Sequence, residues 1–410
     1  MIGSLYSGIS GLKANTSAMA VIGDNIANVD TTGFKSSRVS FANIFSASLS
    51  QTSVQIGRGV MLNGVNPQWE AGSLENTNSA TDLSINGTGL FMVSDPNDGI
   101  SYYTRAGNFD WDKDGNLMTP DGFVVQGYNI DPTTGAVGGI GDIVLPNGTS
   151  APNPTQNISF GMNLDSGSAV GDTFTSSITT YDSLGSEAIL DIELTRTAAS
   201  WDWTVSVNHD NPAASSASTG SIAFDVAGNL DPASSVPPNA NPTIQLDNIG
   251  PATSPMAITW NYLDGAGASD GSITGYSSES SKTAQSQDGY PSGNLQSVSV
   301  NEDGYFTGIY SNGSMIPFAQ LALADFPSYS GLAKQGSNLY AESLASGQPL
   351  LGPPNSASFG SIAPSTLEMS NVDLGTEFVE MITTQRAFQA NSKVITTSDE
   401  ILAELLNIKR

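Results

Sequence analysis

The stretch that decides the fold is Ser370–Leu406, SNVDLGTEFVEMITTQRAFQANSKVITTSDEILAELL. A mostly apolar set of residues recurs in this stretch in alternating steps of four and three. This is the heptad spacing of a helix that packs along one side. The set is Leu374, Phe378, Met381, Gln385, Phe388, Ser392, Ile395, Asp399, Leu402 and Leu406. No proline interrupts the run, and Ser370 followed by Asp373 predicts a capped start. We therefore expect one helix, roughly 55 Å long, whose apolar stripe needs a partner.

The N-terminal residues offer that partner. The same alternation of four and three joins a second set, which is Leu5, Ile9, Leu12, Thr16, Met19, Gly23 and Ile26. The pattern predicts a helix from Ser4 to Asn28 that ends before VDTTG, where Gly33 is expected to take a left-handed backbone conformation. We expect the two ends of the chain to form a helical pair.

The residues between the two helices are rich in β signals. Alternating apolar residues and Asp-Gly turns begin at Asp82, and clearer alternation runs from about 155 to 283. The sequence therefore predicts a multidomain α+β protein with a coiled-coil-like inner domain and two mainly-β domains, the outer one inserted in the inner one. The expected division is 1–30 with 365–410 (helical domain), 31–71 with 350–364 (extended connector with short strands), 72–150 with 285–349 (inner β domain) and 151–284 (inserted outer β domain).

Composition excludes several classes of function. The 410 residues include no cysteine, so disulfides and thiol catalysis are excluded. The formal net charge is −26, and residues 114–281 hold 18 acidic residues against one basic residue, so no nucleic-acid partner is expected. No apolar run is long enough to insert in a membrane, and the N-terminus lacks the pattern of a cleaved signal peptide.

The segment Asp110–Asp121 resembles a calcium-binding loop in its spacing of acidic residues. It has no flanking amphipathic helices, and Asp121 stands where such loops carry glutamate, so a β-hairpin with an Asp-Gly turn is the favoured interpretation. Asp191 and Glu193 share one side of a predicted strand, where a glycosidase could use them, but exposed charge explains them as well. We find no nucleophile, phosphate-loop or metal-ligand motif, and predict no enzyme, no cofactor and no metal.

Several motifs, in consistent order, resemble those of the bacterial flagellar rod and hook protein family. DNIANVDTTGFK at 24–35 is similar to its N-terminal signature, and DLSINGTGLF at 82–91 and YTRAGNF at 103–109 are similar to its core strands. EFVEMI at 377–382 and QRAFQAN at 385–391 resemble its C-terminal signature. The length and the large insertion resemble the hook members more than the shorter distal rod members.

The resemblance implies a structural subunit of a flexible curved tube, a universal joint that couples the rod and motor to the filament. The implied assembly residues on the terminal helices and just after the first helix are Leu5, Ile9, Leu12, Met19, Asn25, Ile26, Asn28, Gly33, Phe34, Leu374, Phe378, Met381, Gln385, Phe388, Asn391, Ile395 and Leu402. The implied partners are further copies of the chain, the distal rod protein, the hook cap, the hook–filament junction protein and the type III export apparatus. The implied location is the flagellar hook, outside the cell.

Two alternatives stay open from the residues. One is a distal-rod-type flagellar protein, which shares both terminal signatures. The other is a secreted calcium-dependent β-rich adhesin or enzyme, which does not need long helical ends.

Overall fold

The computed structural model describes residues 2–45, 57–132, 134–146, 148–209, 211, 213–249 and 255–408. The chain divides into two compact units. Unit 1 comprises Met1–Pro146, Val298–Gly308 and Ile316–Arg410, and unit 2 comprises Asn147–Ser297 and Ile309–Met315. Across the described ranges the protein is mostly β, with two α-helices, and neither helix is long and apolar enough to span a membrane.

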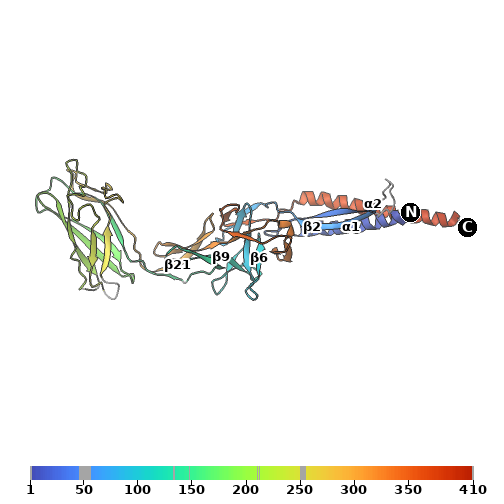
Figure 1. Ribbon diagram of the computed structural model, residues 1–410, viewed down its shortest axis with the longest axis horizontal. Coiled ribbons are helices and arrows are strands. Elements are labelled where there is room, and N and C mark those ends of the chain that lie inside the picture. The colour runs from blue at the N-terminus through green and yellow to red at the C-terminus, as the bar shows by residue number, and fades with distance from the viewer. Residues whose placement is uncertain are drawn as a thin grey trace. The chain divides into compact units, whose positions relative to one another are not determined.

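The helices of unit 1 are α1 (Ile2–Ala27) and α2 (Leu374–Ile408), which lie side by side in Figure 1. They are antiparallel, because the start of α1 lies beside the end of α2 and the end of α1 beside the start of α2. The hydroxyl oxygens of Ser4 and Ser398 are 3.4 Å apart, and the Asn25 amide donates to Glu377 Oε1 at 3.0 Å. The predicted helical pair is therefore present, and the C-terminal turns of α2 extend past the start of α1.

The start of α2 lies close to its predicted position. Asp373 precedes the first helical residue, and its carboxylate accepts the Gly375 N–H at 2.9 Å and the Thr376 hydroxyl at 2.9 Å. These bonds satisfy donors that a helix N-terminus leaves free. Ser370 is not the capping residue, since its hydroxyl accepts the N–H of Val372 instead.

Small residues of α1 make the contact with α2. A Cβ atom on Gly8 would lie 3.0 Å from Ile395 Cγ1, and one on Gly11 would lie 2.8 Å from Asn391 Cγ. The buried positions of α1 are Gly8, Gly11, Ala14, Ala18, Ile22 and Asn25. This face is rotated by about a third of a turn from the predicted apolar stripe, at 3.6 residues per turn. The pair thus forms through a different face of α1 than its large apolar residues predicted.

A long hairpin packs against α1. Strands β1 (Ser37–Phe45) and β2 (Gly57–Pro67) pair antiparallel, and the Val60 N–H donates to the Ser10 hydroxyl on α1 at 3.2 Å. The sequence predicted only a connector with short strands here, because single apolar residues among Ser, Asn and Gly give little alternation. Part of this predicted connector, residues 46–56 with the apolar Val54 and Ile56, lies outside the described residues.

The remaining strands of unit 1 surround a core of fully buried residues that includes Leu83, Phe91 and Leu321. Strand β5 is central, since it pairs with β6, β9 and β24. These strands are β3 (Leu74–Asn76), β4 (Leu83–Asn86), β5 (Leu90–Ser94), β6 (Ser101–Thr104), β7 (Asp110–Trp111), β8 (Leu117–Met118), β9 (Val124–Ile130), β10 (Val137–Asp142), β24 (Leu323–Asp325), β25 (Ala333–Gly336), β26 (Leu339–Ala341), β27 (Leu350–Gly352), β28 (Ser361–Pro364) and β29 (Thr366–Glu368), with a short 3₁₀ turn at Tyr329–Gly331. The chain passes between the units within β21 (Gly293–Val300), β22 (Tyr305–Tyr310) and β23 (Met315–Leu321).

Unit 2 is built of strands, as the alternating residues predicted, and these form two sheets that share one hydrophobic core. One sheet has the order β13 (Thr173–Tyr181), β14 (Glu187–Arg196), β15 (Trp201–His209), β16 (Thr219–Ile222). The other has the order β17 (Thr243–Leu246), β18 (Met256–Trp260), β12 (Asn157–Asn163), β19 (Ile273–Thr274), with β20 (Ser281–Gln287) beside β12; the short β11 (Thr149–Ser150) pairs with β21. Buried and exposed residues alternate along β14, so Asp191 and Glu193 lie on its outward side.

Candidate assembly site

One side of the helical pair of unit 1 presents apolar side chains that no other part of the described chain covers. An apolar groove between the helices is lined by Thr16, Met19 and Ala20 of α1 and by Phe388 of α2. Phe388 is 38% exposed and Phe378 on the same helix is 50% exposed. Large apolar residues left open along a continuous helix side mark an interaction surface.

The predicted assembly residues fall into two groups in the structure. Those on the helix sides are exposed or half-buried: Ile9, Leu374, Phe378, Gln385 and Phe388 are exposed, and Leu5, Leu12, Met19, Ile26, Met381, Asn391, Ile395 and Leu402 are half-buried. Those at the end of α1 are different, because Asn25, Gly33 and Phe34 are buried and Asn28 is half-buried. In the subunit, the residues of the second group pack mainly against other parts of the same chain.

Asn25 fixes the exit from α1. Its side-chain oxygen accepts the Ser37 N–H at 2.9 Å, and its amide donates to the Ser37 carbonyl at 3.0 Å and to Glu377 at 3.0 Å. Asn28 closes the last turn of α1, since its amide donates to the Asp24 carbonyl at 2.9 Å. Asn25 thus ties α1 to β1 and α2, whereas Asn28 acts within the end of α1.

Gly33 has a φ of +69°, which confirms the predicted left-handed conformation. A second constraint was not visible in the sequence. A Cβ atom at this position would lie 2.4 Å from the backbone nitrogen of Ala106, so the chain after α1 passes directly over the end of β6.

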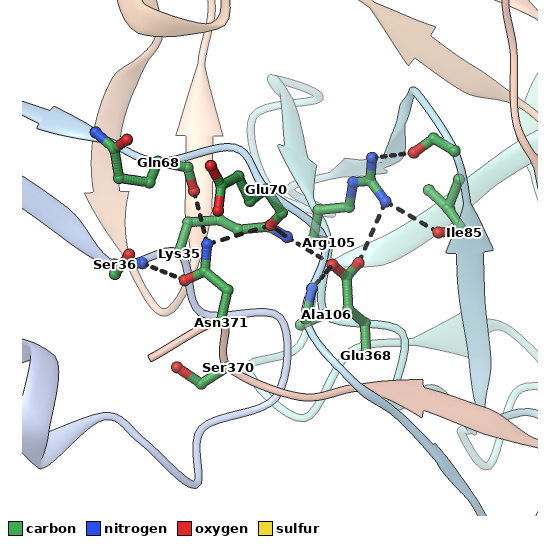
Figure 2. Close-up of polar contacts among 12 residues, drawn as sticks. Lys35, Ser36, Gln68, Glu70, Ile85, Arg105, Ala106, Glu368, Ser370 and Asn371 are labelled. Carbon is green, nitrogen blue, oxygen red and sulfur yellow. Dashed lines mark hydrogen bonds and ion pairs between the residues drawn. The ribbon is translucent and has the colours of Figure 1, made fainter. Parts of the chain in front are cut away.

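A buried charged junction lies at the base of the helices, and Figure 2 shows it. Glu368, at the end of β29, is 1% exposed and accepts from two cations, Lys35 at 2.5 Å and Arg105 at 3.2 Å. Lys35 Nζ also donates to the Glu70 carbonyl at 2.7 Å. Arg105 reaches on to the carbonyl oxygens of Ile85 at 3.1 Å and Gly87 at 2.6 Å.

Asn371 extends the junction toward α2. Its side-chain oxygen accepts the Ser36 N–H at 2.8 Å, and its amide donates to the carbonyls of Gln68 at 3.0 Å and Glu70 at 3.2 Å (Figure 2). The segment that leaves α1, the segment that leaves β2 and the segment that enters α2 therefore meet at one polar cluster.

Sequence reasoning missed the charged junction. Lys35 and Arg105 belong to the motifs that resemble the family, but the sequence gave no role for them. Glu368 lies outside all of these motifs. Burial lowers the pKa of Lys35, and the hydrogen bond and charge of Glu368 oppose that shift. Without Glu368, two cations would be held in the interior with no anion beside them, which is strongly unfavourable.

A second carboxylate, Glu377 on α2, is only partly satisfied. Its Oε2 is buried and has no hydrogen-bond partner among the described residues. Burial raises the pKa of Glu377, the Asn25 hydrogen bond lowers it, and the neighbouring Glu380 and Asp373 raise it further, so that the pKa lies above its ordinary value. The folded protein then binds this proton more tightly than the unfolded chain does. Ionised Glu377 therefore costs stability above its folded pKa, and the cost disappears below the unfolded pKa, near about 4.3.

We expect Glu377→Gln to raise the melting temperature of the monomer at pH 7. The gain should be small, below about 1 kcal/mol, because the group is partly exposed. The difference from the wild type should shrink as the pH is lowered from 7 to about 4, because the Glu377 carboxyl group becomes increasingly protonated in both the folded and the unfolded chain. Thermal melts from pH 4 to 8 would check this, with Glu75→Gln on an exposed strand as the control. A constant difference across that range would contradict it.

The loop that resembles a calcium site is a hairpin, as favoured. Strands β7 and β8 pair through Asp110 with Met118 and Trp111 with Leu117. Asp112 Oδ1 accepts the N–H groups of Asp114 at 2.8 Å and Asn116 at 2.9 Å, and such backbone bonds lower the pKa of Asp112. In the part of the chain that the structure describes, no three His, Cys, Asp or Glu side chains gather to hold a metal.

Comparison with protein families identifies four matching segments. Residues 5–35 match the model described as flagella basal body rod protein, and residues 84–163 match the flagellar hook protein FlgE/F/G D1 domain. Residues 163–290 match the flagellar basal body protein FlaE D2 domain, and residues 363–408 match the flagellar basal body rod FlgEFG protein C-terminal model.

Individual relatives extend this similarity to the whole chain. The flagellar hook protein FlgE of Borreliella burgdorferi is 33% identical over 449 residues, which cover 100% of both chains. That of Salmonella typhimurium is 33% identical over 99% of this chain and 100% of its own. The crystal structure of Helicobacter pylori flagellar hook protein FlgE2 covers 72% of this chain and 100% of its own, with a TM-score of 0.53 and 15% identity, and so supports the fold alone.

Proposed function

This chain belongs to the flagellar hook protein family and is a hook subunit, and from that premise we propose that it polymerises into a flexible, curved tube that transmits torque from rod to filament. The observation that carries the proposal is the open apolar side of the helical pair, with the groove at Met19 and Phe388. Exposed apolar residues on both helices gain burial only when other copies pack against them.

The buried junction gives the subunit a means of transmitting force. Glu368 and Asn371 lie where the segments that leave α1 and enter α2 meet the β domain of unit 1. A load on the terminal helices would pass through these bonds to the strands around Ile85 and Gly87. We propose that the assembly residues named above for the helix sides make the contacts between copies, and that Asn25, Asn28, Gly33 and Phe34 hold the helices in place for them.

The division into domains is part of the proposal. We propose a helical domain (1–30 with 365–410), a connector (31–71 with 350–364), an inner β domain (72–150 with 285–349) and an inserted β domain (151–284). Two sheets with one core support the last of these. A fragment of residues 151–284 is expected to fold alone, which circular dichroism and limited proteolysis would check. An unfolded fragment would contradict these boundaries.

The finer functional statements rest on family membership. The chain is a component of the flagellum, and its relatives are hook proteins, which are structural. We propose that it has no catalytic role, that it is exported by the flagellar type III apparatus, and that it meets the distal rod protein, the hook cap and the hook–filament junction protein. The strongly acidic stretch at 114–281 supports a solvated surface for the inserted domain in the tube.

Electron microscopy of the purified, polymerised protein tests the proposed function. We expect hollow tubes that bend. Straight, stiff tubes would contradict the proposed flexibility. Failure to form any tube, at salt concentrations from about 0.1 to 1 M where charge repulsion is screened, would contradict the proposal.

A further inference from the structure

A polar pocket of about 280 Å³ lies in unit 1 where two of the motifs that resemble the family meet. The motif at 24–35 contributes Thr31 and Thr32 to its walls, and the motif at 103–109 contributes Thr104, Ala106 and Asn108. The turn between β8 and β9 and the turn between β25 and β26 complete the walls. This pocket is separate from the apolar groove on the helical pair.

Contacts within the subunit account for other residues of these motifs but not for the polar side chains of the pocket. Gly33 is required where two backbone segments approach closely, and Arg105 belongs to the charged junction. By contrast, the side chains of Thr32, Asn108 and Asp121 make no hydrogen bond or ion pair with any residue in the described ranges. Their hydrogen-bonding capacity is therefore available to a ligand.

Thr104 adds a buried oxygen to the wall of the pocket. The residue is 1% exposed, and its Oγ1 accepts the Ala106 N–H at 3.0 Å. A hydroxyl oxygen has two lone pairs, so this oxygen can accept one further hydrogen bond from a donor in the pocket.

The charge of the pocket selects the class of ligand. Asp121 is the one ionisable side chain among the described lining residues, so the pocket attracts a cation and repels an anion. A single carboxylate is too few for a hard metal ion, which binds several oxygen ligands, and the described residues include no cluster of metal-binding side chains. The other polar groups of the lining are hydroxyls and amides, whose oxygens accept hydrogen bonds from an organic cation.

We propose that this pocket binds a guanidinium group, with the Asp121 carboxylate paired to it and the hydroxyl and amide oxygens accepting its remaining N–H groups. A guanidinium presents five N–H donors in one plane, and it is less strongly hydrated than an ammonium, so it enters a pocket at a lower cost of desolvation. The volume of about 280 Å³ is close to the lower limit of small-molecule sites, about 300 Å³, and suits an arginine side chain or a small guanidine compound.

The guanidinium group has two sources. One is a small free guanidine compound. The other is an arginine side chain of a second copy, and this source rests on the proposed function. Arg38 and Arg58 are exposed and form no ion pair within the described parts of their own subunit.

Titration of the monomer with methylguanidinium tests the site, with methylammonium as a probe of equal charge. Methylguanidinium is expected to shift the backbone amide NMR signals of Thr104, Ala106 and Asn108 in a saturable manner, with a Kd of about 1–10 mM, because so small a probe makes few contacts. Asp121→Asn should weaken this binding at least about ten-fold, whereas Asp98→Asn, at an exposed carboxylate away from the pocket, should leave the Kd within about two-fold. Absence of a saturable shift, equal binding of methylammonium, or an unchanged Kd in Asp121→Asn would overturn the proposal.

Polymerisation separates the two sources once the titration has shown binding. If an arginine of a second copy fills the pocket, Asp121→Asn should raise the critical concentration about five-fold, and methylguanidinium should raise that of the wild type but not that of Asp121→Asn. If the ligand is a free guanidine compound, both critical concentrations should equal that of the untreated wild type. Failure of the wild type to polymerise would count against the proposed function, whereas the titration of the monomer would still decide the site.

Discussion

Replacing Glu368 by glutamine is expected to destabilise unit 1 by about 3–5 kcal/mol. The carboxylate is 1% exposed and lies 2.5 Å from Lys35 Nζ and 3.2 Å from Arg105 Nη1. Glutamine keeps the size of the side chain and some hydrogen bonding but removes the charge, so two cations remain in the interior without an anion. Urea denaturation of the monomer, followed by the circular dichroism signal of α1 and α2, which both belong to unit 1, would measure the loss.

A matched control separates the buried charge from the substitution itself. Glu342→Gln makes the same chemical change at an exposed position and should leave the midpoint within about 0.5 kcal/mol of the wild type. Adding Lys35→Met to Glu368→Gln should recover part of the loss, because one of the two unpaired cations is removed. An unchanged midpoint for Glu368→Gln would show that the junction is not needed for stability.

Replacing Phe388 by aspartate is expected to abolish polymerisation while the subunit stays folded. Phe388 is 38% exposed in the subunit and lines the apolar groove with Thr16, Met19 and Ala20. A partly exposed site tolerates a charge in the monomer. If copies pack over the groove, each contact would bury an unpaired carboxylate at a cost of several kcal/mol, repeated at every subunit of the tube. Sedimentation and electron microscopy would detect the loss of tubes, and circular dichroism would report the fold.

Val226→Asp provides the comparison for Phe388→Asp. Val226 is a fully exposed apolar residue of unit 2, so the same kind of change there should leave polymerisation intact. Tubes formed by Phe388→Asp at the wild-type critical concentration would contradict the assignment of the groove to the contact between copies.

The sequence by itself determined the two helices. Their heptad spacing over long runs without proline is a local signal, and α1 and α2 lie within a few residues of the predicted ranges. The left-handed conformation of Gly33 could also be predicted, because a glycine after a helix commonly takes a positive φ. The alternating strands of unit 2 were visible for the same reason, since one side of each strand is buried in a core.

The tertiary structure decided which face of α1 meets α2. A heptad pattern finds the large apolar residues, but contact within the subunit is made by Gly8 and Gly11, where small side chains allow the helices to approach closely. Of the large apolar residues of α1, Met19 lines the groove instead. The heptad pattern predicted that the apolar stripe of α1 would pack on α2, and this was wrong in detail, because the buried face of α1 is rotated from that stripe by about a third of a turn.

The charged junction could not be predicted from the sequence either. Lys35 and Arg105 meet Glu368 across 333 and 263 residues of chain, and none of the three has a neighbour in the sequence that would reveal its partner. An isolated Lys or Glu is usually a solvated surface residue, and burial becomes tolerable only when the fold brings the opposite charges together. Local periodicity determined the elements of this protein, whereas packing between distant segments decided which polar groups could be buried.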